Sequence, residues 1–258
     1  LRAAIAADRA AGLVPAGGLL CAGGTSVGAF DRIADCIAVA KAEGVPVHVD
    51  AAWAGSAMIC PEFRELWAGV EGADSIVFNP HKWLGAQFDC SIQFLKDAHA
   101  QVRTLGLRPT YLETAGREEI VNFNEWTVPL GRRFRALKLW FVLRAYGLDG
   151  LRERIRNHVL WAARARDEVA ALPGVNIVTE PRLSLFSFAL ETDAATEALL
   201  QQINDDGRIY LTQTKVDGRF AIRVQVGSFD CREEDVMLIA KTIQEMLASC
   251  SSDSLPSS

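Results

Sequence analysis

The sequence lacks long apolar runs, an excess of positive charge and closely spaced cysteine pairs. Apolar runs such as Gly17–Ala22 are far too short to cross a bilayer. The net charge of -5 provides no basic surface, so we expect neither nucleic acid nor a membrane as a partner. The six cysteines never form the C-x-x-C spacing, which argues against a zinc site and a disulfide framework. Scattered thiols suit a reducing compartment, and we expect a cytoplasmic protein.

The given sequence begins without a methionine, and its first residues are not expected to form a signal peptide. It begins at Leu1 directly in a helical pattern, and Arg2, Asp8 and Arg9 interrupt its alanine-rich start. We therefore expect that an upstream segment is missing from this sequence. At the other end, residues 249–258 are rich in serine and are expected to form a disordered tail.

The proportions of apolar and charged residues are those of a globular protein. Half of the 258 residues are apolar and 23% are charged, which allows a buried core. The first half alternates helical patterns with continuous apolar strands, which predicts an α/β fold with a mostly parallel sheet covered on both faces. The expected helices are 1–11 and 31–43, the second with Asp31 as its N-cap, and the expected strands are 17–22, 45–49, 75–78 and 90–95, the last of them antiparallel.

The second half is organised differently. Residues 96–130 show little periodicity, and a connection of that length is usually functional or mobile. Two long helices are expected next, followed by a small α+β domain. The helices cover 132–146 and 148–172, and the small domain has strands at 175–178, 185–190, 209–214 and 220–226 and helices at 194–205 and 232–248. Residues 1–147 are thus expected to form part of a large domain, and 148–248 a linking helix with the small domain.

Polar side chains follow the expected parallel strands at the points where these strands end. They are Thr25, Asp50, Asn79, His81 and Lys82. In open α/β sheets the carboxyl edge of the strands is where ligands bind. This convergence predicts a ligand site more strongly than any one of the residues does.

Lys82 lies between His81 and Trp83 at the end of an apolar strand. Removing an ammonium group from water is costly, so a desolvated amine there gives up its proton more readily. A neutral amine can act as a Schiff-base nucleophile. Taken alone, however, these residues favour a simpler interpretation, in which the lysine stem lies along apolar surface and its head reaches water.

Asp50 follows a β-branched strand and precedes the small residues Ala51 and Ala52. A carboxylate there could pair with a protonated ring nitrogen and make a cofactor ring an electron sink. Ala52 is small enough to let a flat ring lie against the backbone. The alternative is an aspartate that caps the next turn.

Two other interpretations of this region are weaker. His48, Asp50 and His81 could be metal ligands, but nothing supplies the close-set histidine pair of a metallohydrolase, and we expect no metal. The glycine-rich run Cys21–Gly28 lacks the Walker A ending and the G-x-G-x-x-G spacing. It could let the backbone approach a ring or a phosphate, or be an ordinary strand-to-helix turn.

Several segments together resemble the group II pyridoxal-phosphate decarboxylases, most closely the aromatic-L-amino-acid decarboxylases. The resemblance covers nearly the whole chain except the tail, and the runs Asn-Pro-His-Lys-Trp and His-Val-Asp-Ala-Ala at this separation are highly specific. It implies the PLP-dependent transferase fold (fold type I), with a partial version of a mostly parallel, seven-stranded-type sheet. The matching segments are Val47–Ser56, Ile59–Arg64, Asn79–Leu84, Phe88–Cys90, Pro129–Trp140 and Leu143–Gly147.

The resemblance also implies roles for individual residues. Lys82 would bind pyridoxal 5'-phosphate as a Schiff base, Asp50 would pair with the pyridine nitrogen, and Ala52 would pack on one face of the ring. His81 would lie at the phosphate, with Asn79 and Thr25 near the cofactor. Residues 96–130 would contain the catalytic loop, and its Tyr111 would protonate the substrate carbon after carbon dioxide leaves. The aldehyde-forming branch of the family resembles this pattern with Phe at that position.

The function implied is PLP-dependent decarboxylation of an L-amino acid, with an aromatic substrate expected, in a homodimer. One alternative is a truncated, catalytically incompetent remnant that only dimerises or binds the cofactor. Another is an aldehyde-forming or transaminating enzyme. Arg223 could suggest an aminotransferase carboxylate clamp, but the pattern favours an edge-strand arginine that faces water.

Overall fold

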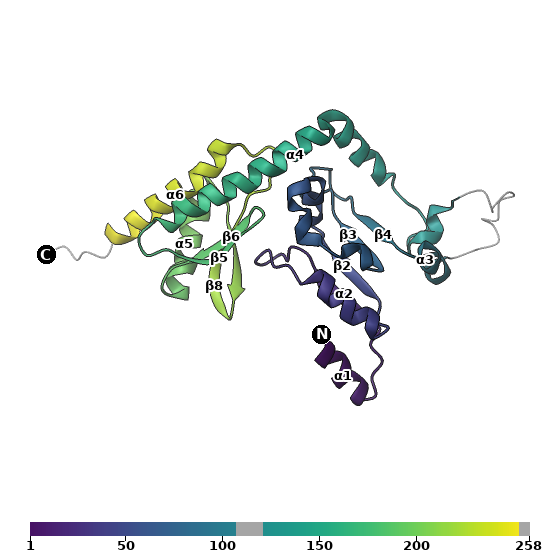
Figure 1. Cartoon of the computed structure of the whole chain (residues 1–258). Coiled ribbons are helices and arrows are strands. Elements are labelled where there is room, and N and C mark those ends of the chain that lie inside the picture. The colour runs from purple at the N-terminus through teal and green to yellow at the C-terminus, as the bar shows by residue number, and fades with distance from the viewer. Residues whose placement is uncertain (107–120, 253–258) are drawn as a thin grey trace.

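The computed structural model describes residues 1–106 and 121–252. They form two α/β units, which the long helix α4 connects (Figure 1). The first unit contains α1 (Arg2–Ala10), β1 (Gly18–Cys21), α2 (Ile33–Ala42), β2 (Val47–Asp50), three short 3₁₀ helices (Ala54–Ile59, Pro61–Trp67, Val70–Gly72), β3 (Ser75–Phe78), β4 (Ile92–Leu95), α3 (Ala98–Leu105) and a 3₁₀ helix at Phe123–Trp126. Then come α4 (Arg135–Ala170), β5 (Asn176–Arg182), β6 (Leu185–Ala189), α5 (Asp193–Asp206), β7 (Thr212–Val216), β8 (Arg219–Gln225) and α6 (Glu233–Ser252).

The first sheet is mostly parallel, as predicted. Its described strands lie in the order β1-β2-β3-β4, with β1, β2 and β3 parallel and β4 antiparallel to β3. Along β2, Val47 and Val49 are buried, whereas His48 and Asp50 are only half-buried. This alternation places the valines in the core and leaves Asp50 accessible at the end of the strand.

The N-cap predicted for α2 is wrong. The helix begins at Ile33 after Arg32, and no side chain caps it. The carboxylate of Asp31 instead accepts a hydrogen bond from the backbone N–H of Cys21 at 2.7 Å. Asp31 therefore stabilises the end of β1 and not the start of α2. A carboxylate can accept a hydrogen bond from a backbone N–H at either place.

Helix α4 consists of two segments, in agreement with the two helices predicted. Gly147 interrupts it with φ 64° and ψ 173°, a conformation that glycine adopts without strain. After this break, Leu151 and Ile155 are buried in the core of the first unit. Farther along, Ala162 and Val169 are buried in the core of the second unit. The second segment of α4 therefore belongs to both cores.

The second unit is a four-stranded antiparallel sheet in the order β5-β6-β8-β7, with α4 and α5 packed on it and α6 packed against these two helices. Strand β7 begins at Thr212, later than the predicted start at 209. The side chain of Asn204 explains the delay, because it binds both the N–H and the C=O of Leu211 at 2.9 and 3.0 Å. At the chain end, α6 extends to Ser252, beyond the predicted start of the serine-rich tail.

Candidate active site

The carboxyl ends of β1, β2 and β3 meet at one edge of the first sheet, because these strands are parallel. Backbone hydrogen bonds continue past the strand ends. The N–H of Ala22 donates to the C=O of Asp50, and the N–H of Asn79 donates to the C=O of Ala52, both at 2.8 Å. Asp50, Ala52 and Asn79 are thus held side by side at the edge where ligands bind in α/β sheets.

Asp50 caps the turn that follows its strand. Its Oδ1 atom accepts a hydrogen bond from the N–H of Ala52 at 2.9 Å, which fixes the orientation of the carboxylate. Burial, and then the negative charges of Asp50 and Asp31, raise the pKa of the Cys21 thiol. Asp50 therefore presents an oriented carboxylate at the strand ends, which is the group that a protonated ring nitrogen would pair with.

Lys82 lies on a tight turn after β3. Its N–H donates to the C=O of Asn79 at 2.9 Å, and the N–H of Ala86 donates to the C=O of Pro80 at 3.1 Å. Lys82 itself is exposed, which agrees with the simpler interpretation of its flanking residues and not with a desolvated amine. The neighbouring Trp83 takes the buried position instead, with 1% of its surface exposed.

A cavity of about 260 Å³ lies beside Lys82, between the two units. The indole of Trp53 stacks on that of Trp83, with the ring centroids 5.1 Å apart, and both rings face the cavity. The first unit contributes Thr25, Trp53, Lys82 and Trp83 to the lining, and the second unit contributes Arg223, Gln225, Gly227 and Ser228. The cavity thus combines an amine, a flat aromatic wall and polar groups from the second unit.

The interpretation of Arg223 as an edge-strand residue facing water is wrong. Strand β8 lies between β6 and β7. From it the Arg223 Nε atom donates to the C=O of Thr25 at 2.8 Å, and Nη2 donates to Gln225 at 3.1 Å. Burial lowers the pKa of Arg223. Arg223 and Gln225 are two residues apart on an apolar strand and so lie on the same face of it. This spacing was the sequence signal that could have identified them as cavity residues.

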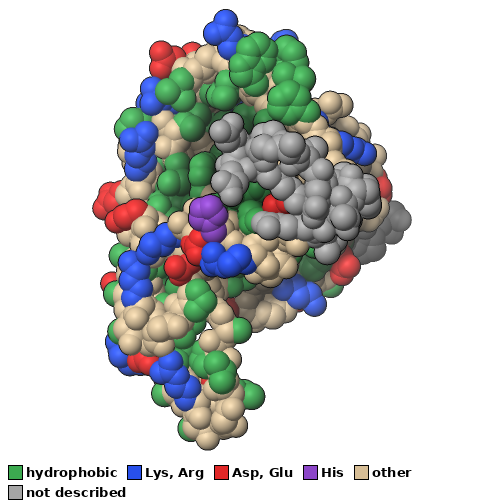
Figure 2. All heavy atoms as spheres, turned by 90° about the vertical axis from the view of Figure 1, so that its right-hand side faces the viewer, with side chains coloured by type: hydrophobic (Ala, Val, Ile, Leu, Met, Phe, Trp, Pro, Cys, Tyr) green, Lys and Arg blue, Asp and Glu red, His purple; other side chains and the backbone are tan. Residues whose placement is uncertain are grey.

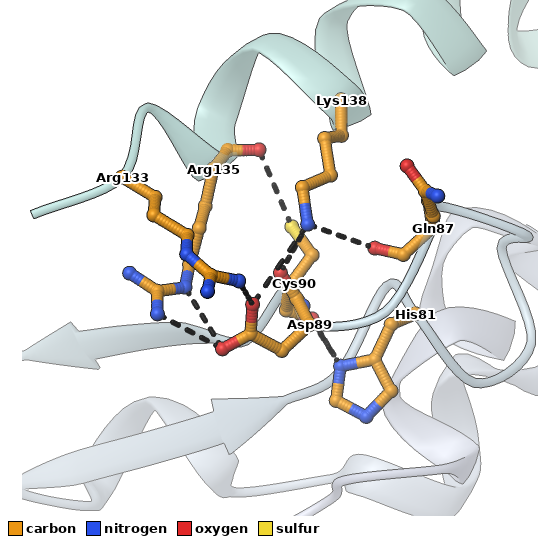
Figure 3. A network of polar contacts seen from close by, with 7 residues as sticks. All are labelled: His81, Gln87, Asp89, Cys90, Arg133, Arg135 and Lys138. Atoms are coloured by element: carbon orange, nitrogen blue, oxygen red, sulfur yellow. Dashed lines mark hydrogen bonds and ion pairs between the residues drawn. The ribbon is translucent and has the colours of Figure 1, made fainter.

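His81 is oriented by the segment that follows Lys82. Its Nδ1 atom lies 2.8 Å from the carbonyl oxygen and 3.0 Å from the backbone nitrogen of Cys90 (Figure 3). The ring of Phe88 packs edge-on against the imidazole at 4.8 Å between centroids. The direction of the His81 ring therefore depends on the position of residues 88–90.

Asp89 anchors that segment to the start of α4. Arg135 donates to Asp89 Oδ2 from Nε at 3.0 Å and from Nη2 at 2.9 Å. Lys138 donates to the C=O of Asp89 at 2.9 Å, and Arg133 lies 4.0 Å from Oδ1 (Figure 3). We call Asp89, Arg133, Arg135 and Lys138 the Asp89 cluster. It connects the turn that carries Lys82 to the helix that joins the two units.

Replacing Asp89 by Asn is expected to lower the free energy of unfolding near neutral pH. The hydrogen bond from Arg135 lowers the pKa of Asp89 to about 2, so the pair stabilises the folded chain above the ordinary carboxyl range. That stabilisation is lost as the pH falls through about 2. Urea unfolding followed by circular dichroism should therefore show a difference between the two proteins that shrinks as the pH approaches that value.

Asp149→Asn is the matched control for this comparison. The Asp149 side chain is 99% exposed and pairs with Arg152 at 3.3 Å, an arrangement that contributes little to stability. An Asp89→Asn effect no larger than that of Asp149→Asn would contradict the anchoring role.

The predicted site residues are only partly brought together. Lys82 and Thr25 line the cavity, whereas Asp50, Ala52, Asn79 and His81 lie at the same sheet edge without lining it. Tyr111 falls in 107–120, outside the described residues. Within the described part of the chain, no three His, Cys, Asp or Glu side chains form a group that could hold a metal ion.

A family model described as the pyridoxal-dependent decarboxylase conserved domain matches residues 1–191. The chain belongs to this family. The aromatic-L-amino-acid decarboxylase of Drosophila lebanonensis is 42% identical over 237 residues, which cover 92% of this chain and 59% of that protein. The predictions of family and cofactor are confirmed, and the cofactor is pyridoxal phosphate.

Solved structures of related enzymes have the same fold. The structure of Oryza sativa TDC with PLP and tryptamine superimposes with a TM-score of 0.90 at 38% identity, covering 95% of this chain and 54% of that one. Rhodiola rosea 4-hydroxyphenylacetaldehyde synthase gives a TM-score of 0.87 at 36% identity, covering 96% of this chain and 52% of that one. The predicted fold class is thus confirmed, and the chain spans about half the length of the relatives that it matches.

The residues present fit pyridoxal phosphate. The Lys82 amine lies at a cavity with a flat indole wall, which suits a planar ring that carries an aldehyde. The Oδ1 atom of Asn79 is buried, and no described residue donates a hydrogen bond to it, so a polar atom at the sheet edge is left for a ligand. The fixed carboxylate of Asp50 stands at the same edge.

Proposed function

We propose that the chain contains the cofactor-binding half of an enzyme that decarboxylates an aromatic L-amino acid to the amine and carbon dioxide. The observation that carries this proposal is Lys82 at a cavity with stacked indole walls, in a chain of the pyridoxal-dependent decarboxylase family. The proposal is supported by relatives that are aromatic-L-amino-acid decarboxylases. The test is formation of equal amounts of amine and carbon dioxide from tryptophan, tyrosine or dopa by the purified chain with the cofactor.

Pyridoxal phosphate, when bound, supplies an electron sink for the electron pair that remains on the substrate carbon when carbon dioxide leaves. Lys82 would hold the cofactor covalently through its amine and release it to the substrate. Asp50 would hold a proton on the ring nitrogen, because its carboxylate is fixed by Ala52. Ala52 would pack on the ring, and the polar groups of His81, Asn79 and Thr25 would bind around it.

Tyr111→Phe is expected to reduce amine formation and, with molecular oxygen as the oxidant and water as co-reactant, to increase formation of the aldehyde, ammonia and hydrogen peroxide. We assign Tyr111 the delivery of a proton to the substrate carbon, and a phenyl ring has no proton to deliver. Loss of such a general acid typically costs about 10²–10⁴-fold in rate. Product analysis of amine, aldehyde, ammonia and peroxide from one substrate measures the shift.

Tyr210→Phe is the control for this variant, since Tyr210 is 78% exposed and does not line the Lys82 cavity. It should leave the product ratio unchanged. Amine output from Tyr111→Phe equal to that of the unmodified chain would contradict the assignment.

An aldehyde-forming reaction is the second candidate, favoured by the similarity to the Rhodiola rosea aldehyde synthase. The same product analysis separates the two reactions, because ammonia and peroxide accompany only the aldehyde. A folded chain that takes up no cofactor would instead support a catalytically incompetent remnant, an alternative that the half-length match keeps open.

A homodimer is part of this proposal, and the first segment of α4 supports it. Several large apolar side chains of that segment are exposed, and Figure 2 displays hydrophobic side chains gathered at the top of the molecule, where Figure 1 places this part of α4. Exposed apolar patches of this kind are typical of protein interfaces. The exposed side chains of this segment are Leu137, Trp140, Phe141 and Leu143, and Phe134 is exposed directly before the helix. Sedimentation equilibrium of the chain, and of Trp140→Glu, would test self-association.

We also propose a cytoplasmic location. The structure describes the side chains of residues 1–106 and 121–249. The five cysteines in these ranges are all free thiols, which suits a reducing compartment. No described helix is both long and apolar enough to span a membrane.

A further inference from the structure

The indole of Trp83 connects the Lys82 turn to the second segment of α4. Its Nε1 atom donates a hydrogen bond to Nδ1 of His158 at 2.9 Å, and both side chains are 1% exposed. The imidazole and the indole are nearly parallel, at 9° with centroids 6.4 Å apart. On its other side, Trp83 stacks on Trp53 at the cavity wall. Trp83 is thus fixed from two directions, one of which is His158.

The donor from Trp83 determines the protonation of His158. Because Nδ1 accepts a hydrogen bond, the proton of the neutral imidazole is on Nε2. Burial, and then the positive charge of Arg154, lower the pKa of His158 to about 4. The imidazole is therefore neutral near neutral pH, and Nδ1 is available as an acceptor.

A second contact joins the same part of α4 to the Lys82 turn. The Arg154 guanidinium lies 3.4 Å over the ring of Phe229 and donates to the Phe229 carbonyl. Phe229 in turn covers Gly85, where an added Cβ would lie 1.9 Å from the ring. Residues 154–158 of α4 therefore contact the Lys82 turn twice, at Trp83 directly and at Gly85 through Phe229.

We propose that His158 is a positioning residue for Lys82, which holds the indole of Trp83 and thereby fixes the turn that carries the Lys82 amine at the cavity. The importance of this placement rests on the proposed role of Lys82 as the cofactor-binding residue. His158 does not line the cavity, and it acts only through Trp83.

The test is hydrogen–deuterium exchange of residues 79–86 in the full chain, without cofactor. His158→Leu removes the acceptor, and Trp83→Phe removes the donor while keeping an aromatic ring. Each is expected to speed exchange of this segment by about fivefold, the change expected from the loss of one hydrogen bond. The double variant should exchange no faster than either single variant, because both remove the same interaction.

Two further variants separate positioning from general stability. His158→Asn keeps an acceptor close to the position of Nδ1 and should restore exchange to within about twofold of the unmodified chain. Val169→Ala, in the core of the second unit, should lower the unfolding midpoint without changing exchange of 79–86. Unchanged exchange in both His158→Leu and Trp83→Phe would overturn the proposal. So would equal acceleration in Val169→Ala, or failure of His158→Asn to restore protection.

The same variants, loaded with pyridoxal phosphate, give a second readout. Dissociation of the cofactor should be faster in His158→Leu than in His158→Asn, and Trp83→Phe is left out of this comparison because Trp83 itself lines the cavity. An unmodified chain that binds no cofactor would contradict the proposed function, whereas the exchange experiment would still decide the role of His158.

Discussion

Lys82→Ala is expected to abolish the visible absorbance band of the bound cofactor and to lower decarboxylation by roughly a thousand-fold or more. The amine of Lys82 is the nucleophile at the cavity wall that we assign to the cofactor aldehyde. Alanine removes this amine while leaving the turn intact, because the Lys82 N–H that donates to Asn79 belongs to the backbone. Titration of the purified variant with pyridoxal phosphate, followed by absorbance and by carbon dioxide release, measures both effects.

Lys215→Ala is the control for nonspecific reaction of the cofactor with exposed lysines. Lys215 is exposed on β7 and does not line the Lys82 cavity. It should titrate like the unmodified chain. A band that persists in Lys82→Ala, or that is lost equally in Lys215→Ala, would remove the basis for the assigned role of Lys82.

Asp50→Asn is expected to retain the cofactor and to slow decarboxylation by roughly 10²–10³-fold, the usual effect of removing one preorganised electrostatic group. Asparagine keeps an oxygen that can accept the hydrogen bond from Ala52, so the turn is preserved. It offers no negative charge to hold a proton on the ring nitrogen, and the electron sink is weakened. Single-turnover rates of the cofactor-loaded protein isolate this effect from binding.

Asp31→Asn is a closely matched control for Asp50→Asn. Both aspartates accept a backbone N–H at a strand end, and both charges raise the pKa of Cys21. Asp31 serves the end of β1, and we assign it no contact with the cofactor. Equal losses of rate in the two variants would mean that Asp50 acts through local structure and not through the ring nitrogen.

The parts of this fold that the sequence predicts are those that depend on neighbouring residues in the chain. The apolar run at β2 predicts a buried strand, and Gly147 predicts the break in α4. The antiparallel β4 was also predicted correctly. Asp31 shows where prediction from neighbouring residues fails. It was predicted to cap α2, but its carboxylate accepts a hydrogen bond from the N–H of Cys21, ten residues away in the chain.

The second half of the cavity could not be predicted from local pattern. Arg223 and Thr25 are 198 residues apart in the chain and meet only because β8 is packed toward the first unit. His158 gives no sequence signal at all, since a lone histidine in a helical pattern does not indicate an indole donor 75 residues earlier. The roles assigned to the site residues all stay predictions: Lys82, Asp50, Ala52, His81, Asn79, Thr25 and Tyr111.

The second segment of α4 has a consequence for cooperativity. Leu151 and Ile155 pack in the first core, and Ala162 and Val169 pack in the second, so successive turns of one helix contribute to both cores. The two units therefore share part of their folding free energy through a single helix. The cavity between them is lined by residues of both units, so it exists only while this helix holds the two units together.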